Sequence, residues 1–153
     1  MNYIPLQTNY QEYIEVRESS IHHKGVFAKK YIPKDGIIIE YTGEIIPNEE
    51  AERRELENNK RGLTYIFILD DQHCIDGAIA GNEAKYINHS CDPTCIPEII
   101  DGRIWIIANR DIKPGEELTY DYEFPHDDPM RDKCCCASKN CRGFIQLSEP
   151  EKR

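Results

Sequence analysis

The sequence predicts a mostly β fold with one short charged helix and a small metal-bound tail, and three observations lead to this prediction. Short runs of β-branched and aromatic residues recur along the chain, separated by turn residues. A single stretch, residues 48–60, has the composition of a helix. Four of the seven cysteines crowd between Cys134 and Cys141, in a segment too short to fold without help.

The expected strands share a run of apolar residues bounded by turn signals such as Pro33-Lys34-Asp35-Gly36. The last two runs flank Asp101-Gly102, which favours a type I′ hairpin turn. We therefore expect several short strands, the final pair joined as a hairpin. These strands are expected at residues 13–18, 37–41, 64–69, 99–100 and 103–108.

A helix is expected from Asn48 to Lys60, where Glu, Arg, Ala, Leu and Asn predominate. Asn48 is a candidate N-cap, and Glu49, Glu50 and Glu52 suit the positive end of the helix dipole. Because few of its residues are apolar, we expect this helix to be mostly solvated.

Length and charge limit the possible partners. The 153 residues have the size of one domain with tails. With 19 Lys and Arg against 28 Asp and Glu, the formal net charge is −9, so we expect no direct binding of nucleic acid and attraction of a Lys-rich peptide. No apolar run approaches the roughly 18 residues of a membrane span, and the N-terminus lacks a signal-peptide core. We expect no membrane association and a soluble intracellular protein, nuclear in a eukaryote, and cytoplasmic or delivered to a host in a bacterium.

The cysteine-rich tail follows a Pro- and Asp-rich stretch, residues 125–133, that is typical of a linker. Residues 134–141 contain a C-x-C-x4-C pattern, which supplies three thiolates in one tight loop. Structural zinc takes four ligands, so the fourth must come from Cys74, Cys91 or Cys95. The alternative is a cluster of reduced cysteines or a redox disulfide.

Two motifs are informative only together: Lys85-Tyr86-Ile87-Asn88-His89-Ser90-Cys91-Asp92-Pro93 and Gly115-Glu116-Glu117-Leu118-Thr119-Tyr120-Asp121-Tyr122. A buried Asn-His pair alone is most often a hydrogen-bonding node, and Tyr-x-Tyr is most often one face of a strand. The acidic side chains of Glu116, Glu117, Asp121, Asp127 and Asp128 either steer a basic substrate or form a solvated face.

These two motifs are preceded by Lys24-Gly25-Val26-Phe27-Ala28 and followed by the cysteine tail. The order of these four pieces resembles that of SET-domain lysine methyltransferases with a post-SET tail. The resemblance covers about Tyr13 to Phe144. It is greatest to the trithorax branch, through residues 21–25, 39–43 and 117–125.

The resemblance implies a fold of small curved β-sheets in which the Asn88-His89 segment and the Tyr122 segment interlace as a pseudoknot. Combined with the composition of the ends, it predicts four parts of the chain. They are an N-terminal extension at 1–12, a SET domain at 13–124, a linker and post-SET zinc-binding tail at 125–147, and a disordered C-terminus at 148–153.

The resemblance also implies S-adenosyl-L-methionine as cofactor and one structural Zn²⁺. The expected cofactor contacts are His22, Lys24, Gly25, Val26, Phe27, Tyr65, Asn88, His89, Cys135 and Phe144. The expected zinc ligands are Cys91, Cys134, Cys136 and Cys141.

The implied activity is transfer of a methyl group to lysine in a protein or peptide, in particular an H3-like histone tail. Accessory subunits that support this activity are compatible with the resemblance. Tyr122 resembles the family tyrosine beside the transferring methyl, and Tyr65 and Tyr120 would line the lysine channel. Tyr120 is similar to the family position where tyrosine restrains and phenylalanine permits higher methylation, so mainly monomethylation is expected. The alternatives are a non-catalytic peptide or methyl-lysine binding module and a methyltransferase of a non-histone protein.

Three positions depart from the family pattern. His23 stands where the Gly-x-Gly cofactor turn usually begins with glycine, and a side chain there restricts positive φ. Ala137 stands where glycine usually follows Cys136, and Lys85 replaces an arginine. None of these changes removes a reacting group.

Overall fold

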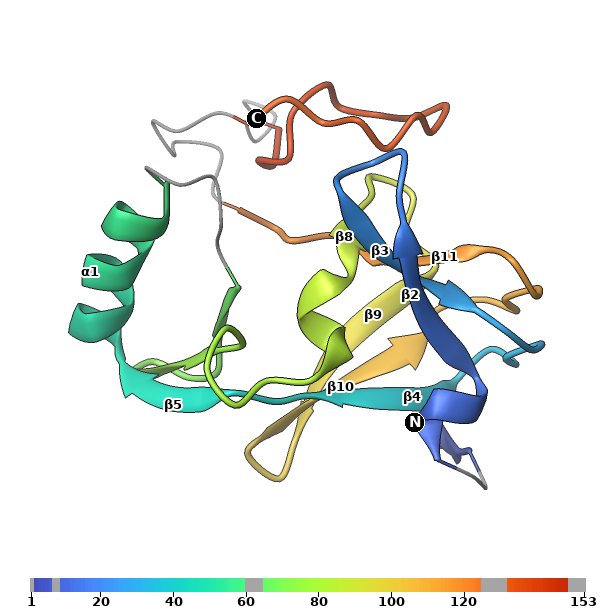
Figure 1. Cartoon of the computed structure of the whole chain (residues 1–153), viewed down its shortest axis with the longest axis horizontal. Coiled ribbons are helices and arrows are strands. Elements are labelled where there is room, and N and C mark those ends of the chain that lie inside the picture. The colour runs from blue at the N-terminus through green and yellow to red at the C-terminus, as the bar shows by residue number, and fades with distance from the viewer. Residues whose placement is uncertain (1, 7–8, 60–64, 125–131, 149–153) are drawn as a thin grey trace, which may run out of the picture.

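The computed structural model describes residues 2–6, 9–59, 65–124 and 132–148 (Figure 1). Within these ranges the chain is mostly β, as predicted, with a single α-helix. The strands are β1 (Ile4–Pro5), β2 (Ile14–Glu18), β3 (Lys24–Ala28), β4 (Gly36–Tyr41), β5 (Glu44–Pro47), β6 (Ile66–Ile68), β7 (His73–Asp76), β8 (Asn88–His89), β9 (Cys95–Ile100), β10 (Arg103–Ala108) and β11 (Glu117–Tyr120). The helices are α1 (Asn48–Asn59) and the 3-10 helices η1 (Tyr10–Glu12) and η2 (Glu83–Tyr86).

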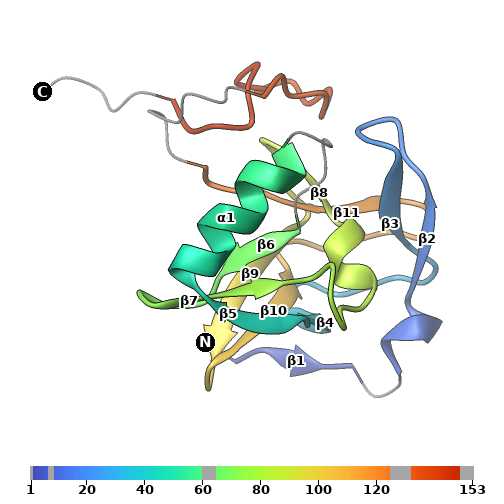
Figure 2. The same ribbon diagram turned by 60° about the vertical axis from the view of Figure 1, so that its left-hand side comes forward.

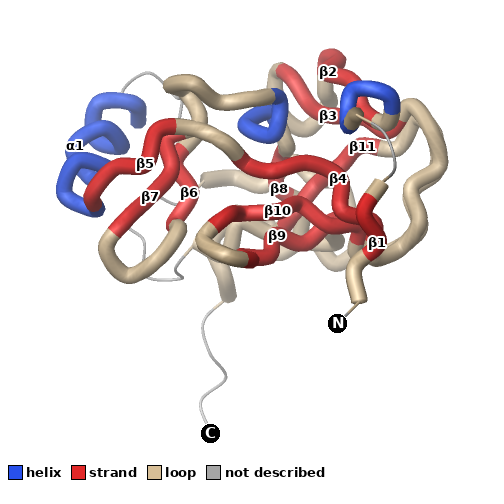
Figure 3. The backbone as a smooth tube through the Cα atoms, turned by 90° about the horizontal axis from the view of Figure 1, so that it is seen from below, coloured by secondary structure: helices blue, strands red, loops and turns tan. Residues whose placement is uncertain are grey.

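The strands form three small sheets, with orders β1-β4-β10-β9, β2-β3-β11-β8 and β5-β7-β6. The third sheet lies at one end of the molecule beside α1, as the view from below makes clear (Figure 3). Figure 2 shows α1 lying across this sheet. Small sheets of this kind leave strand ends and loops on the surface, where binding residues can gather.

The main core lies between the first two sheets and consists largely of isoleucine. Ile32, Ile104, Ile106, Ile112 and Leu118 have no solvent-accessible surface. A satellite cluster of Ile46, Ala51 and Cys74 packs beneath α1. The apolar faces of the strands and Ala51 of α1 therefore account for the burial.

Arg54 attaches α1 to the sheet beneath it. Its Nη1 donates hydrogen bonds to Glu44 and Asp76, both at 2.9 Å, and its Nε donates to Glu50 at 2.7 Å. Asp76 is almost completely buried, whereas Arg54 is 18% exposed. The helix thus satisfies a buried carboxylate of β7.

The sequence-predicted hairpin is confirmed: β9 and β10 are antiparallel neighbours joined by Asp101 (φ 51°) and Gly102 (φ 75°). Both central residues have the positive φ of a type I′ turn. The capping role expected for Asn48 is wrong. Among the described contacts, its side chain donates to the Asp71 carbonyl and accepts from the Cys74 thiol, so it joins α1 to β7.

Some predictions fall outside the described residues: Lys60 in the helix, Thr64 in the third strand, most of the linker and the last five residues of the predicted disordered C-terminus. In the described part of the chain, no helix is both long and apolar enough to span a bilayer.

Candidate functional site

The two sequence motifs meet because β8 pairs with β11. The strands are parallel, with Asn88 opposite Thr119 and His89 opposite Tyr120. The Ser90 N–H extends the pairing by donating to the Tyr120 carbonyl at 3.3 Å. Figure 1 shows β8 and β11 side by side near the middle of the molecule. The parallel pairing places the side chains that follow β11 next to β8.

Tyr122 is fixed at both ends. Its hydroxyl donates to the Ile87 carbonyl at 2.6 Å, and its backbone N–H donates to His89 Nδ1 at 3.1 Å. The ring centroid lies 4.9 Å from that of Tyr120 and 5.3 Å from that of His89. Burial, and secondarily the Glu117 carboxylate, raise the pKa of Tyr122 well above its ordinary value. The hydroxyl is therefore protonated at neutral pH.

The other predicted channel residues belong to one aromatic cluster. Tyr120 packs against Phe67 with centroids 5.7 Å apart, and Phe67 packs against Tyr41 at 5.2 Å. The Tyr41 hydroxyl donates to the backbone carbonyl of Tyr65, whose ring meets Tyr86 edge-on at 6.1 Å. Tyr65 thus comes from a separate part of the chain to the region of Tyr120 and Tyr122.

Sequence reasoning missed Tyr41 and Phe67 as members of this cluster. A signal for Phe67 was present, because residues two apart on a strand share a face and Phe67 follows Tyr65 by two. No local signal marked Tyr41, which lies in a β-branched run that reads as ordinary core.

Asn88 connects the motifs to the turn before β3. Its Nδ2 donates to the Lys24 carbonyl at 2.8 Å and to Glu117 Oε1 at 2.9 Å, and His22 O lies at 3.4 Å. Because Nδ2 faces these acceptors, Oδ1 points to the other side of the amide, where it can accept a hydrogen bond. The predicted cofactor residues His22, Lys24 and Asn88 are therefore neighbours.

Glu117 was missed by sequence reasoning as a site residue and is not a solvated acid. Ser19 Oγ donates to both Glu117 oxygens, at 2.8 and 3.0 Å, in addition to the bond from Asn88. A Cβ on Gly25 would come within 2.1 Å of Glu117 Oε1. Glycine at position 25 therefore makes room for this carboxylate.

Cations and aromatic rings lie beside this amide network. The ammonium groups of Lys24 and Lys85 are each 5.2 Å from the centroid of the Tyr86 ring, within cation–π range. His22 meets the ring of His23 edge-on at 4.4 Å, and burial followed by the neighbouring His23 lowers the pKa of His22. His23 is not among the described residues with positive φ, so its side chain is tolerated in the turn.

Four cysteines gather next to β8. The Sγ atoms of Cys91, Cys134, Cys136 and Cys141 all lie within 4.8 Å of one another. Zn–S bonds of about 2.3 Å in a tetrahedron separate the sulfurs by about 3.8 Å, and Cys91 and Cys134 are 3.8 Å apart. Cys135 is exposed, and Cys74 and Cys95 are buried in β7 and β9. The four gathered thiols fit a structural zinc ion.

Hydrogen-bond donors lie near these sulfurs, and their effect competes with burial, which raises the pKa of Cys91 and of Cys134. The N–H groups of Arg142 and Gly143 donate to Cys91 and Cys141, each at 3.4 Å. Burial opposes ionisation of Cys136, but the Ser138 hydroxyl and nearby backbone donors lower its pKa to about 5. Thiolates are the form that binds zinc.

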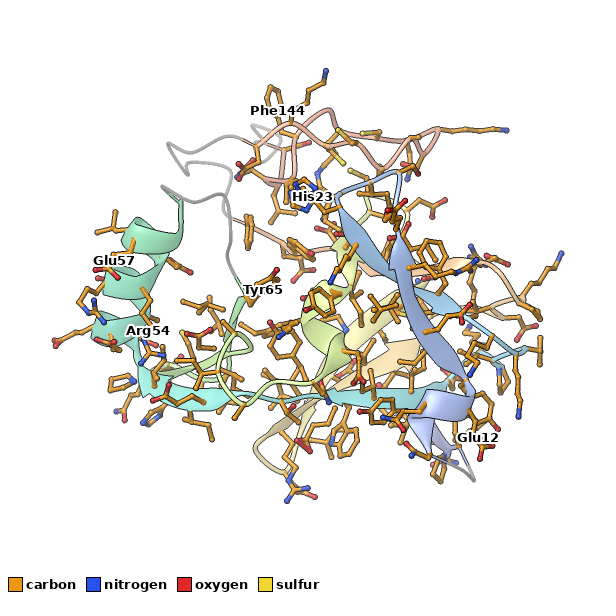
Figure 4. All side chains as sticks on the ribbon, in the orientation of Figure 1. Glu12, His23, Arg54, Glu57, Tyr65 and Phe144 are labelled. Carbon is orange, nitrogen blue, oxygen red and sulfur yellow. The ribbon has the colours of Figure 1, made fainter. Side chains whose placement is uncertain are left out.

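The tail also carries the remaining predicted cofactor contacts. Phe144 is 40% exposed, and Cys135 is exposed. Figure 4 shows Phe144 and His23 on the same side of the molecule, with Phe144 on the tail above the turn that bears His23. The roles of both tail residues stay predictions.

A family model described as SET domain matches residues 23–123, which include both motifs and β3. The chain belongs to the SET-domain family. The match runs from His23 to Glu123, so it contains every predicted tyrosine of this SET domain and stops before the cysteine tail.

Relatives of this SET domain include histone-lysine N-methyltransferase trithorax from Drosophila virilis, 40% identical over 95% of the chain, and histone-lysine N-methyltransferase 2D from Homo sapiens, 42% identical over 94%. The chain spans only 4% and 3% of their lengths. A Schizosaccharomyces pombe histone-lysine N-methyltransferase, H3 lysine-4 specific, is 44% identical over 83% of the chain and 14% of its own length.

The fold of the SET domain is also found in the crystal structure of KRYPTONITE in complex with mCHG DNA and SAH. The two superpose with a TM-score of 0.74 at 30% identity, covering 86% of this chain and 28% of that one. This similarity confirms the fold class expected from the motifs.

Proposed function

We propose that this SET domain is an S-adenosylmethionine-dependent protein-lysine N-methyltransferase that mainly monomethylates an H3-like histone tail. The observation that carries the proposal is the position of Tyr122, held between the Asn88-His89 strand and the aromatic cluster. The relatives named histone-lysine N-methyltransferase support the reaction class, and the fission yeast relative named H3 lysine-4 specific supports the substrate class.

The residues around Asn88 fit the chemistry of the cofactor. The carboxylate of S-adenosylmethionine could pair with the ammonium groups of Lys24 and Lys85, and its amine could donate a hydrogen bond to Asn88 Oδ1. Its flat adenine base could stack on the exposed ring of Phe144. The KRYPTONITE structure is a complex with SAH. When bound, S-adenosylmethionine supplies an activated methyl group on a sulfonium.

The aromatic cluster would prepare the acceptor. Free lysine titrates near 10.4, so a neutral amine at pH 7 costs about 4 to 5 kcal/mol. Tyr65, Phe67 and Tyr120 form apolar walls that disfavour the ammonium and so offset part of this cost. The Tyr122 hydroxyl is protonated and donates to the Ile87 carbonyl, so it would orient the reacting groups and would not act as a base. Alignment of the reacting atoms is then the main contribution of the protein.

Tyr120 supports the assignment of monomethylation. Its ring is buried, yet no described side chain or backbone group forms a hydrogen bond with its hydroxyl. A water held there would occupy the space that a second or third methyl group needs.

Zinc would be held by Cys91, Cys134, Cys136 and Cys141 and would act as a structural cross-link. It would join the tail to the end of β8 and so keep Cys135 and Phe144 near the turn that precedes β3. The proposed chain regions, with a post-SET tail at 125–147, rest on this cross-link.

We also propose a nuclear location if the source is a eukaryote and a cytoplasmic or host-delivered one if it is a bacterium, with a lysine-bearing protein as partner and accessory subunits compatible with activity. The proposal excludes direct contact with nucleic acid, because a net charge of −9 repels phosphate. The DNA in the KRYPTONITE complex is a ligand of that protein.

The test is a methyl-transfer assay with labelled S-adenosylmethionine on core histones and a mixture of basic proteins, with sites read by mass spectrometry. We expect incorporation on lysine that falls at least a hundredfold in Tyr122→Phe and is unchanged in Tyr31→Phe, whose side chain is half exposed. Cofactor binding and bound zinc without any incorporation would favour the binding-module alternative, and a non-histone target would correct the substrate.

A further inference from the structure

The cysteine tail folds back on itself before it meets the rest of the protein. The Cys134 N–H donates to the Gly143 carbonyl and the Ile145 N–H donates to the Asp132 carbonyl, both at 2.9 Å. One backbone bond, from the Leu147 N–H to the Phe124 carbonyl at 2.8 Å, ties the end of this fold to the segment after β11. A small hairpin of this kind needs further attachments to hold one position.

Arg142 provides such an attachment through its side chain. Nη1 and Nη2 donate to the two Asp121 oxygens at 2.7 and 3.2 Å, which is a bidentate pair. The remaining donors bind the tail itself, with Nη2 to Ile145 O at 2.6 Å and Nε to Gln146 O at 3.2 Å. One guanidinium therefore shapes the tail and fastens it to the SET domain.

Asp121 lies between the two tyrosines of the site. Its Oδ1 accepts a hydrogen bond from the Glu123 N–H at 2.9 Å and lies 3.6 Å from His89 Nδ1, the atom that accepts from the Tyr122 N–H. Glu123 adopts a φ of 53°, so the chain bends sharply just after Tyr122. The Asp121 carboxylate thus holds the bend that follows Tyr122.

The pair differs from the surface ion pairs of this protein. Arg142 and Asp121 are 18% and 23% exposed, whereas Arg53 and Glu57 are 56% and 63% exposed. Loss of one member would leave the other charge partly desolvated and unpaired, which costs more than losing a solvated pair.

We propose that Arg142 is a positioning residue for methyl transfer: its pair with Asp121 locks the tail onto the end of β11 and thereby fixes the Tyr122 segment. The inference rests on the proposed function. The cysteine cluster attaches the tail at one point, and the Arg142–Asp121 pair attaches it at a second point nearby. Two attachments fix the orientation of the tail, whereas one would leave it free to rotate.

The experiment uses the full zinc-loaded chain with Arg142→Ala, Asp121→Ala, the double alanine variant and Asp121→Glu/Arg142→Lys, which keeps both charges and the combined length. Lys139→Ala removes an exposed cation from the same tail and is the matched control. Zinc content, hydrogen exchange of residues 132–148, affinity for S-adenosylhomocysteine, and kcat and KM for the substrate are measured for each.

We expect each alanine variant to keep its zinc, to speed exchange in the tail about tenfold and to lower kcat about tenfold with a small change in KM. The double alanine variant should be no worse than either single one, because both remove the same interaction. The Glu/Lys variant should recover part of the loss, and Lys139→Ala should match wild type.

Independent, multiplying effects of the two alanine substitutions, or unchanged exchange in the tail, would overturn the inference. Hydrogen exchange needs no turnover, so it still decides the locking of the tail if the wild-type protein transfers no methyl group. In that event the proposed function fails separately, and with it the link to kcat.

Discussion

The amide of Asn88 and the carboxylate of Glu117 share a hydrogen bond of 2.9 Å, although 29 residues separate them along the chain. The same carboxylate accepts from Ser19, next to the turn that carries His22 and Lys24. Glu117 and the Lys24 carbonyl, which accepts from the same Nδ2 at 2.8 Å, therefore set which end of the Asn88 amide faces the turn.

Glu117→Ala should weaken binding of S-adenosylhomocysteine about tenfold, because the Asn88 amide loses one of the two close acceptors that set its orientation. Glu117→Gln keeps an oxygen acceptor and should lose only about two- to threefold. Isothermal titration calorimetry measures both. Glu116→Ala, which alters the neighbouring acid paired with Arg110, is the control and should bind normally. Equal affinity in Glu117→Ala and wild type would contradict this role.

Tyr120→Phe should shift the product from monomethyl- toward di- and trimethyl-lysine. The substitution removes the hydroxyl that would hold a water in the aromatic cluster and leaves the ring contacts with Phe67 and Tyr122 in place. Mass spectrometry of peptide product over a time course gives the ratio. Tyr13→Phe, outside the cluster that surrounds Tyr122, should keep the wild-type ratio. An unchanged ratio in Tyr120→Phe would contradict the prediction that Tyr120 limits the product to monomethyl-lysine.

Ala137→Gly should strengthen zinc binding about two- to fivefold. Ala137 has a φ of 57°, a left-handed conformation that costs an alanine about 1 to 2 kcal/mol, and glycine adopts it freely at a smaller cost in chain entropy. Competition with a chelator measures the affinity. Ala78, whose φ is not positive, supplies the control, since Ala78→Gly should leave zinc affinity as it is. Weaker zinc binding in Ala137→Gly would show that the strain is absent.

Arg54→Ala should lower the Tm by about 5 °C or more, because it leaves the buried Asp76 carboxylate without its cation. Arg53→Ala changes the adjacent arginine, whose partners Glu50 and Glu57 are on the surface, and should shift the Tm by about 1 °C or less. Thermal unfolding followed by circular dichroism compares the two. Equal Tm shifts in the two variants would mean that Arg54 contributes no more to stability than the surface residue Arg53.

The rate of methyl transfer should rise with pH between about 6.5 and 9.5 without a descending limb. The acceptor lysine becomes neutral as pH increases, and burial keeps the pKa of Tyr122 above its ordinary value near 10, so its hydroxyl keeps its proton throughout. A profile of log kcat/KM against pH tests this, with circular dichroism as a check on folding. A fall below pH 9 in folded protein would point to a site group that must stay protonated and is not Tyr122.

Local chemistry was enough to predict the elements that depend on few residues. The Asp101-Gly102 turn follows from two residues that accept positive φ, and β10 follows from its β-branched run. The grouping of cysteines was predictable in part, since the spacing gave three thiols and the family resemblance gave Cys91. The structure brings these four together.

The acidic residues show where sequence reasoning stops. Glu117 and Asp121 were grouped with steering or solvated acids, but both are held by partners from other elements, Asn88 and Arg142. Their environment depends on the pairing of β8 with β11 and on the position of the tail, neither of which a local pattern encodes. Asp127 and Asp128 of the same group lie outside the described residues.

The contact between Cys91 and the tail also sets an order of events during synthesis. Cys91 leaves the ribosome 43 residues before Cys134, which takes about 2 to 9 seconds at typical translation rates. Over that interval the thiol of Cys91 has no tail cysteines beside it. A newborn chain thus becomes competent for its proposed reaction only once residues 134–141 have emerged, and until then Cys91 lacks the three thiols that gather with it.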